Sequence, residues 1–456
     1  MDMNRHSTSS RSLLAPVVFF LALATACNST TSTQSGLSAF ERGDGALALN
    51  EWTPAAEQGD AQAQYLVGMA HDEGRGIVRD PAEAAVWYRR AAAQGHAAAQ
   101  NNLGLLYASG DGVARSYEEA AIWYRRAADG GFAAAQSNLG LLYLLGLGVE
   151  RDTTAARELL ERAAAQGHAR AECLLGDVHG QGLGVPKDPD RAVTWYRRAA
   201  DHGDVSAQYQ LALAYVRGEG VGVDDAVACG WLERSADQGF VPAQFLLGWR
   251  LTRGSFTPTD TSSTDGTTGV AITNGNARRP TEAELAAGAT WLTRAAEQGS
   301  SAAQAEIGSM YLHGRGVPND DAKAAQWLHR SAEQGFARAQ YDLALLYSKG
   351  RGVEVNLNEA VNWLRRAAEQ GFAPAQTKLG LAYEHGRGVE ADLVTACAWY
   401  DLATTNGDTS ARAERNRISS RLTPDEQERA SAHAREWTPR AETTPGDSLL
   451  GGVTGH

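Results

Sequence analysis

A tryptophan recurs along the chain with a period of 36 residues. Eight of nine equivalent positions carry it, Leu159 occupies the ninth, and the one longer interval runs from 231 to 291. A fixed period of this length predicts an array of repeated units, each of which buries apolar surface against its neighbours instead of in one central core. Such an array offers an extended surface and seldom a catalytic pocket. The tryptophans, which we expect to be structural, are Trp87, Trp123, Trp195, Trp231, Trp291, Trp327, Trp363 and Trp399.

Each unit has the sequence of two helices. In the second unit Ala99, Leu103 and Tyr107 are four residues apart, which places them on one face of a first helix. A Gly-x-Gly-Val loop follows, and the next slot holds a residue that caps helix N-termini, so a second helix begins there. A glycine closes the unit at the C′ position, where positive φ is free only for glycine. The capping slot holds Asp80, Ser116, Asp152, Asp188, Asp224, Asp320, Asn356 and Asp392.

The second helix carries a small residue three positions before the tryptophan, as Ala120 stands before Trp123. A small residue permits a close helix crossing, and we expect the tryptophan to fill the gap in each helix pair. The predicted fold is an all-α, right-handed α-solenoid of about nine helix-turn-helix units over residues 60–407. Residues 37–59 are predicted to form one N-terminal capping helix, residues 408–437 the C-terminal capping helices, and residues 438–456 a disordered tail.

An insertion rich in Ser, Thr and Gly, residues 255–280, accounts for the one long interval. Thr281 and Glu284 at its end have the spacing of a capping box, so the second helix of that unit is predicted to begin there. Removal of 24 residues from the insertion restores the 36-residue period.

The pattern of one whole unit, residues 97–131, resembles the Sel1-like repeat, a relative of the tetratricopeptide repeat. The residues that carry the resemblance are Ala-Gln, Leu-Gly, Tyr, Gly-x-Gly-Val, Trp-Tyr and Ala-Ala, and it extends over residues 37–437. It implies an α-solenoid that usually works as an adaptor, and it implies no reaction. The departures from the pattern are Leu159 in place of Trp, and His71, His179 and Leu251 in place of Tyr.

The N-terminus predicts export. Two arginines precede an apolar run, residues 13–23, that is too short to span a membrane, so residues 1–26 are predicted to be a signal peptide. The segment ending in Ala26-Cys27 resembles the lipobox of bacterial lipoproteins, which implies a lipid on Cys27, although Ala24 stands where Leu is usual. Ordinary secretory cleavage after Ala26 is the alternative, with a soluble periplasmic or secreted product. Residues 27–36 are then a polar tether, and Asn28 favours the outer membrane over the inner one.

The formal net charge of −12 makes the chain a poor polyanion binder, so no nucleic-acid partner is predicted. Arginine nevertheless forms a column in the second helix. It is either a ladder for anionic ligands or, as we favour, a solvated face whose stems cover the tryptophans and whose heads meet nearby carboxylates. The column consists of Arg90, Arg126, Arg162, Arg198, Arg234, Arg294, Arg330 and Arg366.

No motif of catalysis, cofactor binding or metal binding is present. Ser-x-x-Lys, Gly-x-Ser-x-Gly, His-Glu-x-x-His and a Walker loop are all missing. His313 and His385 share a column but stand two units apart, too far to share a metal. Three further cysteines are expected to be packed small residues: Cys173, Cys229 and Cys397. We therefore predict no enzyme and no cofactor; the alternative is a periplasmic hydrolase of cell-wall or β-lactam type.

The predicted function is a non-catalytic periplasmic adaptor, tethered to the outer membrane, that holds a protein, a peptide or an envelope glycan. Candidate partners include the machinery of peptidoglycan or exopolysaccharide, and a structural spacer in a secretion or motility apparatus is a third possibility. In the related tetratricopeptide fold the first helix lines the concave groove, and the columns at 101, 105 and 108 form a ridge that the predicted core does not use. Filler between repeats is the alternative role of this ridge. The candidate binding residues are Asn101, Tyr209, Phe245, Trp249 and Tyr341.

Overall fold

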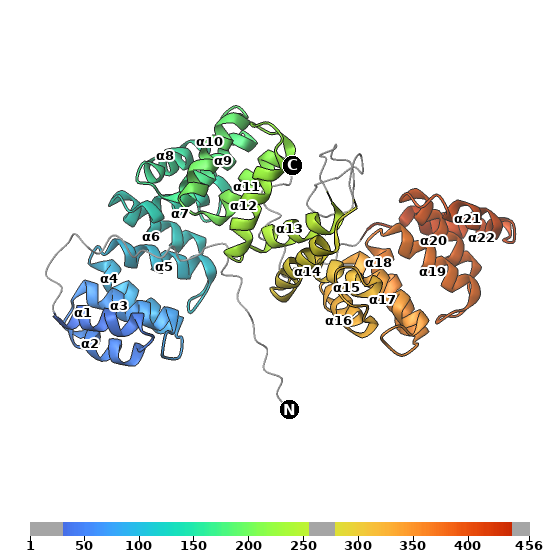
Figure 1. Ribbon diagram of the computed structural model, residues 1–456, viewed down its shortest axis with the longest axis horizontal. Helices are drawn as coiled ribbons and strands as arrows, with labels where there is room; N and C mark the ends of the chain where they lie inside the picture. Colours follow the sequence, from blue (N-terminus) through green and yellow to red (C-terminus); the bar gives the residue numbers. More distant parts are fainter. Residues whose placement is uncertain (1–30, 255–278, 440–456) are drawn as a thin grey trace. The chain divides into compact units, whose positions relative to one another are not determined.

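The computed structural model describes residues 31–254 and 279–439. Within these ranges all regular structure is helical, with 22 helices and no strand (Figure 1). The chain divides into two compact units, Met1–Asp224 and Asp225–His456, and each is described by itself.

The first unit contains α1 to α11. Their bounds are α1 Thr31–Glu41, α2 Gly45–Glu57, α3 Ala61–Glu73, α4 Pro81–Ala93, α5 Ala97–Ser109, α6 Tyr117–Asp129, α7 Ala133–Leu145, α8 Thr153–Ala164, α9 Ala169–Gln181, α10 Pro189–Asp201 and α11 Val205–Arg217.

The second unit contains α12 to α22. Their bounds are α12 Asp225–Asp237, α13 Val241–Arg253, α14 Glu282–Glu297, α15 Ser301–His313, α16 Asp321–Glu333, α17 Ala337–Lys349, α18 Leu357–Glu369, α19 Ala373–His385, α20 Leu393–Thr405, α21 Ala411–Ser419 and α22 Pro424–Glu436.

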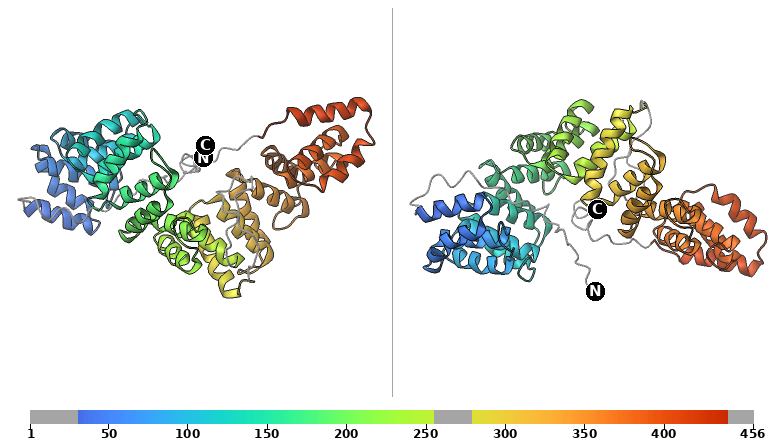
Figure 2. Two further views of the ribbon diagram at one scale, coloured as in Figure 1. Left: turned by 90° about the horizontal axis from the view of Figure 1, so that it is seen from above. Right: turned by 60° about the horizontal axis from the view of Figure 1, so that its bottom comes forward.

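The repeats are helix pairs, as predicted. We call the first helix of each repeat helix A (α3, α5 and so on to α19) and the second helix B (α4 to α20). Within each unit, helix A packs against helix B of its own repeat, as α5 does on α6, and against helix B of the repeat before it, as α5 does on α4 (Figure 1, Figure 2). The fifth repeat lies at the boundary of the two units, with α11 in the first and α12 in the second. The sixth repeat is also one pair, because α13 packs on α14 although residues 254–281 separate them. The all-α solenoid is therefore confirmed.

The predicted helix ends are confirmed at most positions. Seven of the capping side chains accept a backbone N–H at the start of helix B, and the glycines that close the repeats have φ between 76° and 102°. Thr281 and Glu284 form the capping box of α14. The seven capping residues are Asp80, Ser116, Asp152, Asp188, Asp320, Asn356 and Asp392.

The prediction of one N-terminal helix over residues 37–59 is wrong. The chain forms two helices there, because Gly43 adopts φ of 85° and Asp44 caps α2 through the backbone N–H of Leu47 at 3.0 Å. Phe40 of α1 packs on Trp52 of α2, with ring centroids 5.7 Å apart. Residues 31–36 of the predicted tether therefore belong to α1. The predicted signal peptide and Cys27 lie outside the described residues.

The C-terminal closing helices are α21 and α22, close to the predicted bounds. Thr423 and Glu426 form a capping box at the start of α22, and Pro424 occupies its first position. Residues 440–456 of the predicted tail lie outside the described part of the chain.

The side chain that fills each helix pair is the residue after the tryptophan, not the tryptophan itself. Tyr88 and Tyr124 are 1% and 2% exposed, as is expected of a pair interior. A glycine of helix A makes room for this side chain, since a Cβ on Gly104 would come within 2.6 Å of the Tyr124 ring. Where alanine replaces this glycine at 344, the equivalent partner is the smaller Leu364, and leucine is also the partner of Gly140, Gly248 and Gly308.

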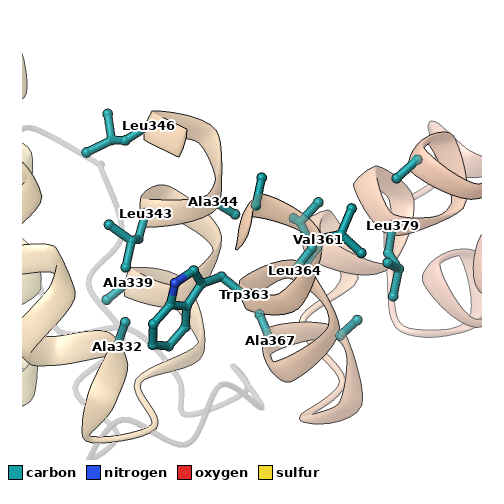
Figure 3. Close-up of a cluster of buried hydrophobic side chains, with 14 of the residues drawn as sticks. Ala332, Ala339, Leu343, Ala344, Leu346, Val361, Trp363, Leu364, Ala367 and Leu379 are labelled. Atoms are coloured by element: carbon teal, nitrogen blue, oxygen red, sulfur yellow. The ribbon is translucent and has the colours of Figure 1, made fainter. Parts of the chain in front are cut away.

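The tryptophans lie at the junctions between consecutive repeats. Trp363 packs in one buried cluster with Ala332 of the preceding repeat and with Ala339 and Leu343 of its own repeat (Figure 3), and His329 of the preceding repeat meets its ring edge-on at 5.8 Å. The tryptophans are nevertheless not equally covered: Trp87, Trp363 and Trp399 are 7% exposed, whereas the other five are half-buried. The core is thus a series of local clusters, each shared by neighbouring repeats.

Candidate functional site

A ladder of buried glutamines joins neighbouring repeats. The helix faces that carry these glutamines are occupied by packing. In helix A, Gln100 donates from Nε2 to the carbonyl of Ala92, 3.0 Å away in the preceding helix B. The amide oxygen of the equivalent Gln340 accepts from Gln370 of the next helix B at 2.8 Å. Since Gln340 also donates to the carbonyl of Ala332 at 3.1 Å, both ends of its amide are used in packing.

One repeat replaces the glutamine by a carboxylate. Glu172 is fully buried, and its oxygens lie 2.7 Å from Nδ1 of His202 and 2.8 Å from Nη2 of Arg198. Burial of a charge requires such partners. The same repeat carries a second polar cluster, in which the hydroxyl of Tyr196 donates to Asp177 at 2.8 Å. Burial raises the pKa of Asp177 to about 6, against the effects of this hydrogen bond and of Arg170.

The arginine column covers the tryptophans. Seven guanidinium groups stack on the indole three residues earlier, at 4.4–4.8 Å from the ring centroid. Where Leu159 replaces the tryptophan, Arg162 instead donates to the carbonyl of Ala128 at 3.3 Å. The expectation that arginine stems cover the tryptophan layer is confirmed, and one head, that of Arg198, meets a carboxylate. Cation–π contact with a defined ring fixes these side chains without a ligand.

The helix A face is the most promising surface for a partner. Neighbouring A helices contact one another directly, as α7 does with α9 and α13 with α15, while no two B helices pack as closely within the described residues. The A helices therefore form the inner side of each stack. We define the inner face as the side chains of helix A that point away from helix B, including its sixth and last residues.

The predicted binding residues are partly taken up by packing. Asn101 is only 6% exposed and accepts from Asn138 of the next repeat at 2.9 Å, which makes it filler between repeats rather than a contact residue. Tyr209, in the first unit, is half-buried, and burial raises the pKa of its hydroxyl. In the second unit Phe245 packs against the core between α14 and α15. The structure does not place these five side chains in one patch.

Trp249 and Tyr341 remain half-exposed within the second unit. The guanidinium of Arg253 lies 4.5 Å above the Trp249 ring, and Phe372 meets Tyr341 edge-on at 5.5 Å. Both aromatics are therefore held in place by neighbours while part of each ring is accessible.

A network of charges that the sequence did not reveal crosses three A helices of the second unit. Arg253 of α13 donates to Glu306 of α15 at 2.9 Å, and Arg338 of α17 donates to the same oxygen at 3.3 Å. Arg338 also lies 3.9 Å from Asp342. Burial raises the pKa of Asp342 to about 6, against the opposing effect of Arg338 and His313.

This network has a spacing that could have been found in the sequence. The pair of Arg253 and Glu306 joins the last residue of one helix A to the sixth residue of the next, positions that are 29 residues apart in an uninterrupted repeat. We call this pair of positions an inter-repeat junction. It is the main place on the inner face where side chains of different repeats meet without belonging to the core.

No other arrangement in the described residues points to chemistry. The described helices include none that combines the length and the apolarity needed to cross a bilayer, and the same residues hold no group of three or more metal-ligating side chains. A groove of about 660 Å³ lies between α8 and α10, lined by Arg157, Glu161, His179 and Trp195 among others. It exists because Glu161 and His179 replace an arginine–tyrosine hydrogen bond such as that of Arg125 with Tyr143 at 2.7 Å.

Several solved structures are similar to this chain. The chain is similar to the protective antigen c5321 of uropathogenic Escherichia coli, with 29% identity, coverage of 93% of this chain and 94% of that one, and a TM-score of 0.43. A Sel1 repeat protein from Oxalobacter formigenes is 33% identical over 48% of this chain and 90% of that one, with a TM-score of 0.45. The immunity protein Pa5087 from Pseudomonas aeruginosa is 23% identical over 43% and 72%, with a TM-score of 0.33.

No curated protein matches the chain. The model of the Sel1 repeat matches ten segments: residues 61–96, 97–132, 133–168, 169–204, 205–240, 241–263, 282–300, 301–336, 337–372 and 373–408. Two of these, 241–263 and 282–300, are the halves of the repeat that the insertion interrupts, so the ten segments correspond to nine helix pairs. Sel1 repeats generally mediate protein–protein interaction. The chain belongs to the Sel1 repeat family.

Proposed function

We propose that this protein is a non-catalytic scaffold that holds a protein or peptide partner on the inner face of its A helices. The observation that supports this proposal is that some positions of helix A serve packing while others face outward. Leu, Ala, Gln and Gly positions of helix A are buried in packing, whereas the last residue of helix A varies from repeat to repeat and lies outside the core. The sixth residue also varies: it is a buried leucine at 66, 174 and 246, and it lies outside the core in the other repeats. Variable side chains on a rigid frame are what specific recognition requires.

The proposed location is the periplasmic side of the outer membrane, with the protein attached through a lipid on Cys27. The support is the sequence of residues 13–27, since an apolar run followed by Ala-Cys is typical of lipoprotein precursors. Cys27→Ser is expected to release the protein, unacylated, into the soluble periplasmic fraction. Recovery of the unaltered protein in that fraction would contradict the lipid anchor and favour ordinary secretion.

The scaffold proposal is tested by crosslinking and affinity capture from native envelopes. The double variant Tyr209→Ala, Trp249→Ala removes one half-buried aromatic from the inner face of each unit. We expect it to recover less partner than the unaltered protein while its melting temperature changes little. Normal capture together with much earlier melting would show that these rings serve the core and that the partner binds elsewhere.

A catalytic role is tested separately. Purified protein is expected not to hydrolyse the chromogenic β-lactam nitrocefin, because no nucleophile–base pair occurs among the motifs of the sequence. Turnover that is saturable and lost on heat denaturation would favour the hydrolase alternative over the scaffold.

A further inference from the structure

We propose that the inter-repeat junction formed by Lys349 of α17 and Lys378 of α19 binds a carboxylate of an acidic segment in the partner. This inference rests on the proposed scaffold function and names the chemistry of the partner. Within the second unit the junctions can be compared directly, since they occupy equivalent positions of the same repeat.

The first two junctions each combine a basic side chain with a carboxylate. At the first, Arg253 is hydrogen-bonded to Glu306 at 2.9 Å. At the second, the equivalent residues are His313 and Asp342, and His313 is close enough to lower the pKa of the Asp342 carboxyl. The repeat geometry therefore brings the two side chains of a junction within electrostatic reach of each other.

The third junction has two cations and no carboxylate. Lys349 is the last residue of α17 and Lys378 the sixth of α19, and both are exposed. Lys323 forms an ion pair with Asp320, but neither Lys349 nor Lys378 has a carboxylate oxygen within 4.0 Å among the described residues. Like charges at positions where the first junction holds an ion pair repel each other, and an anion from outside would offset this repulsion.

Helix electrostatics explain one of these lysines and not the other. A cation at the C-terminal end of a helix is favoured by the helix dipole, which accounts for Lys349 and for the bases at the ends of α13, α15 and α19. Lys378 lies in the middle of α19, beyond the reach of that effect. Its position is explained by what it faces across the junction.

The neighbouring side chains indicate a peptide as the source of the carboxylate. On the same helix as Lys349, Tyr341 offers a half-exposed ring. A chain with a net charge of −12 repels extended polyanions as a whole. Only a ligand that makes close contacts with the two lysines therefore overcomes this long-range electrostatic repulsion. An acidic peptide segment with an adjacent apolar side chain meets both conditions.

The lysine content of the chain permits a sharp test. Lys187, Lys323, Lys349 and Lys378 are its only lysines, so two lie at the junction and two elsewhere. A fluorescein-labelled octaglutamate peptide is titrated with the full chain at low ionic strength, and binding is followed by fluorescence anisotropy. Carbodiimide coupling of the bound peptide, followed by peptide mapping, then identifies which lysines touch its carboxylates.

We expect Lys349→Gln, Lys378→Gln to weaken binding about tenfold, whereas the matched control Lys187→Gln, Lys323→Gln leaves it unchanged. Lys378→Glu recreates the ion pair of the first junction and is expected to weaken binding at least as much. All three variants change exposed side chains, and circular dichroism confirms that they fold. Equal binding by the first variant and its control, coupling spread evenly over the four lysines, or no binding at all would overturn the proposal.

Two further arms separate this proposal from its alternatives. Tighter binding of phosphatidylglycerol vesicles than of octaglutamate, lost in the same variant, would assign the junction to a lipid surface and overturn the peptide proposal. If the unaltered protein captures an envelope partner and Lys349→Gln, Lys378→Gln captures it equally well, this inference fails and the scaffold function stands. If the unaltered protein captures no partner, the scaffold function itself fails.

Discussion

The two units are built from the same packing residues and differ in the chemistry of their inter-repeat junctions. In the first unit three of the four junctions are uncharged: Ser109 with Asn138, Leu145 with Leu174, and Gln181 with Gln210. In the second unit every junction has an ionisable side chain on both sides. The comparison teaches that different positions of the repeat serve the two roles: the packing residues hold the stack together, and the junction residues are what the inner face presents to a partner.

The shared frame is visible in matched distances. The glutamine of helix A donates to the preceding helix B at 3.0 Å from Gln100 and at 3.1 Å from Gln340, and an arginine stacks 4.5 Å above Trp123 as it does above Trp363. Since these contacts are the same in both units, differences between the units in stability or binding are expected to arise at the tryptophans that differ in exposure and at the junctions.

The largest expected effect is a difference in stability loss between two tryptophans, each of which is stacked by an arginine three residues later. Trp363→Ala should cost about 3–5 kcal/mol, because the side chain is 7% exposed and its loss leaves a cavity. Trp195→Ala, at a half-buried position of the first unit, should cost about 1–3 kcal/mol. Hydrogen exchange resolved by helix measures each loss locally. Equal losses would show that burial of the indole is not what stabilises the junctions.

The next effect concerns the fit of glycine to tyrosine inside a helix pair. Gly104→Ala should destabilise the first unit by about 1–3 kcal/mol, because the added methyl group meets the Tyr124 ring. Adding Tyr124→Leu should restore part of this loss, since the second unit already pairs Ala344 with Leu364. Urea denaturation of the single and double variants measures the coupling. Additive losses would contradict the proposed complementarity of the two positions.

A smaller effect depends on pH and has one example in each unit. Burial raises the pKa of both Asp177 and Asp342 to about 6, from 3.8, so the folded protein binds these protons more tightly than the unfolded chain. Stability should therefore decrease as pH rises from about 4 to 6 and then level off. Asp177→Asn and Asp342→Asn should each stabilise the protein on the order of 1 kcal/mol at pH 7.5 and have little effect at pH 4. Thermal melts across this range provide the check, and a benefit that is independent of pH would contradict burial as the cause.

The smallest effect is expected from the insertion in the sixth repeat. Helix α14 has 16 residues where α16 and α18 have 13, so it begins about one turn early. Deletion of residues 255–275 leaves five residues between Gly254 and the cap Thr281, as between Gly110 and Ser116, and refines the predicted removal of 24. The shortened protein should keep its helical circular dichroism and melt within about 0.5 kcal/mol of the full chain. Marked destabilisation would indicate that the insertion contributes to packing.

Features that depend on one helix or one turn were predictable from the sequence. The N-caps, the closing glycines and the pairing of helices follow from local rules, and they hold across the interruption at α13 and α14. The buried residue of each pair was misplaced by one position, because Trp123 and Tyr124 are both large aromatics and periodicity alone does not separate adjacent positions. The burial of Asn101 and the charge network at Glu306 depend on contacts between repeats, which no single helix encodes.

The glutamine ladder makes the repeats interchangeable. In the three consecutive repeats of Gln304, Gln340 and Gln376, the buried glutamine donates to an alanine carbonyl of the preceding helix B and accepts from an amide at the end of its own repeat, so these repeats present the same connections. Excision of one full period, such as residues 337–372, would bring Gln376 to the carbonyl of Ala332 and leave no amide without a partner. The length of the array and the chemistry of its inner face can then change independently, one repeat at a time, without redesign of the rest.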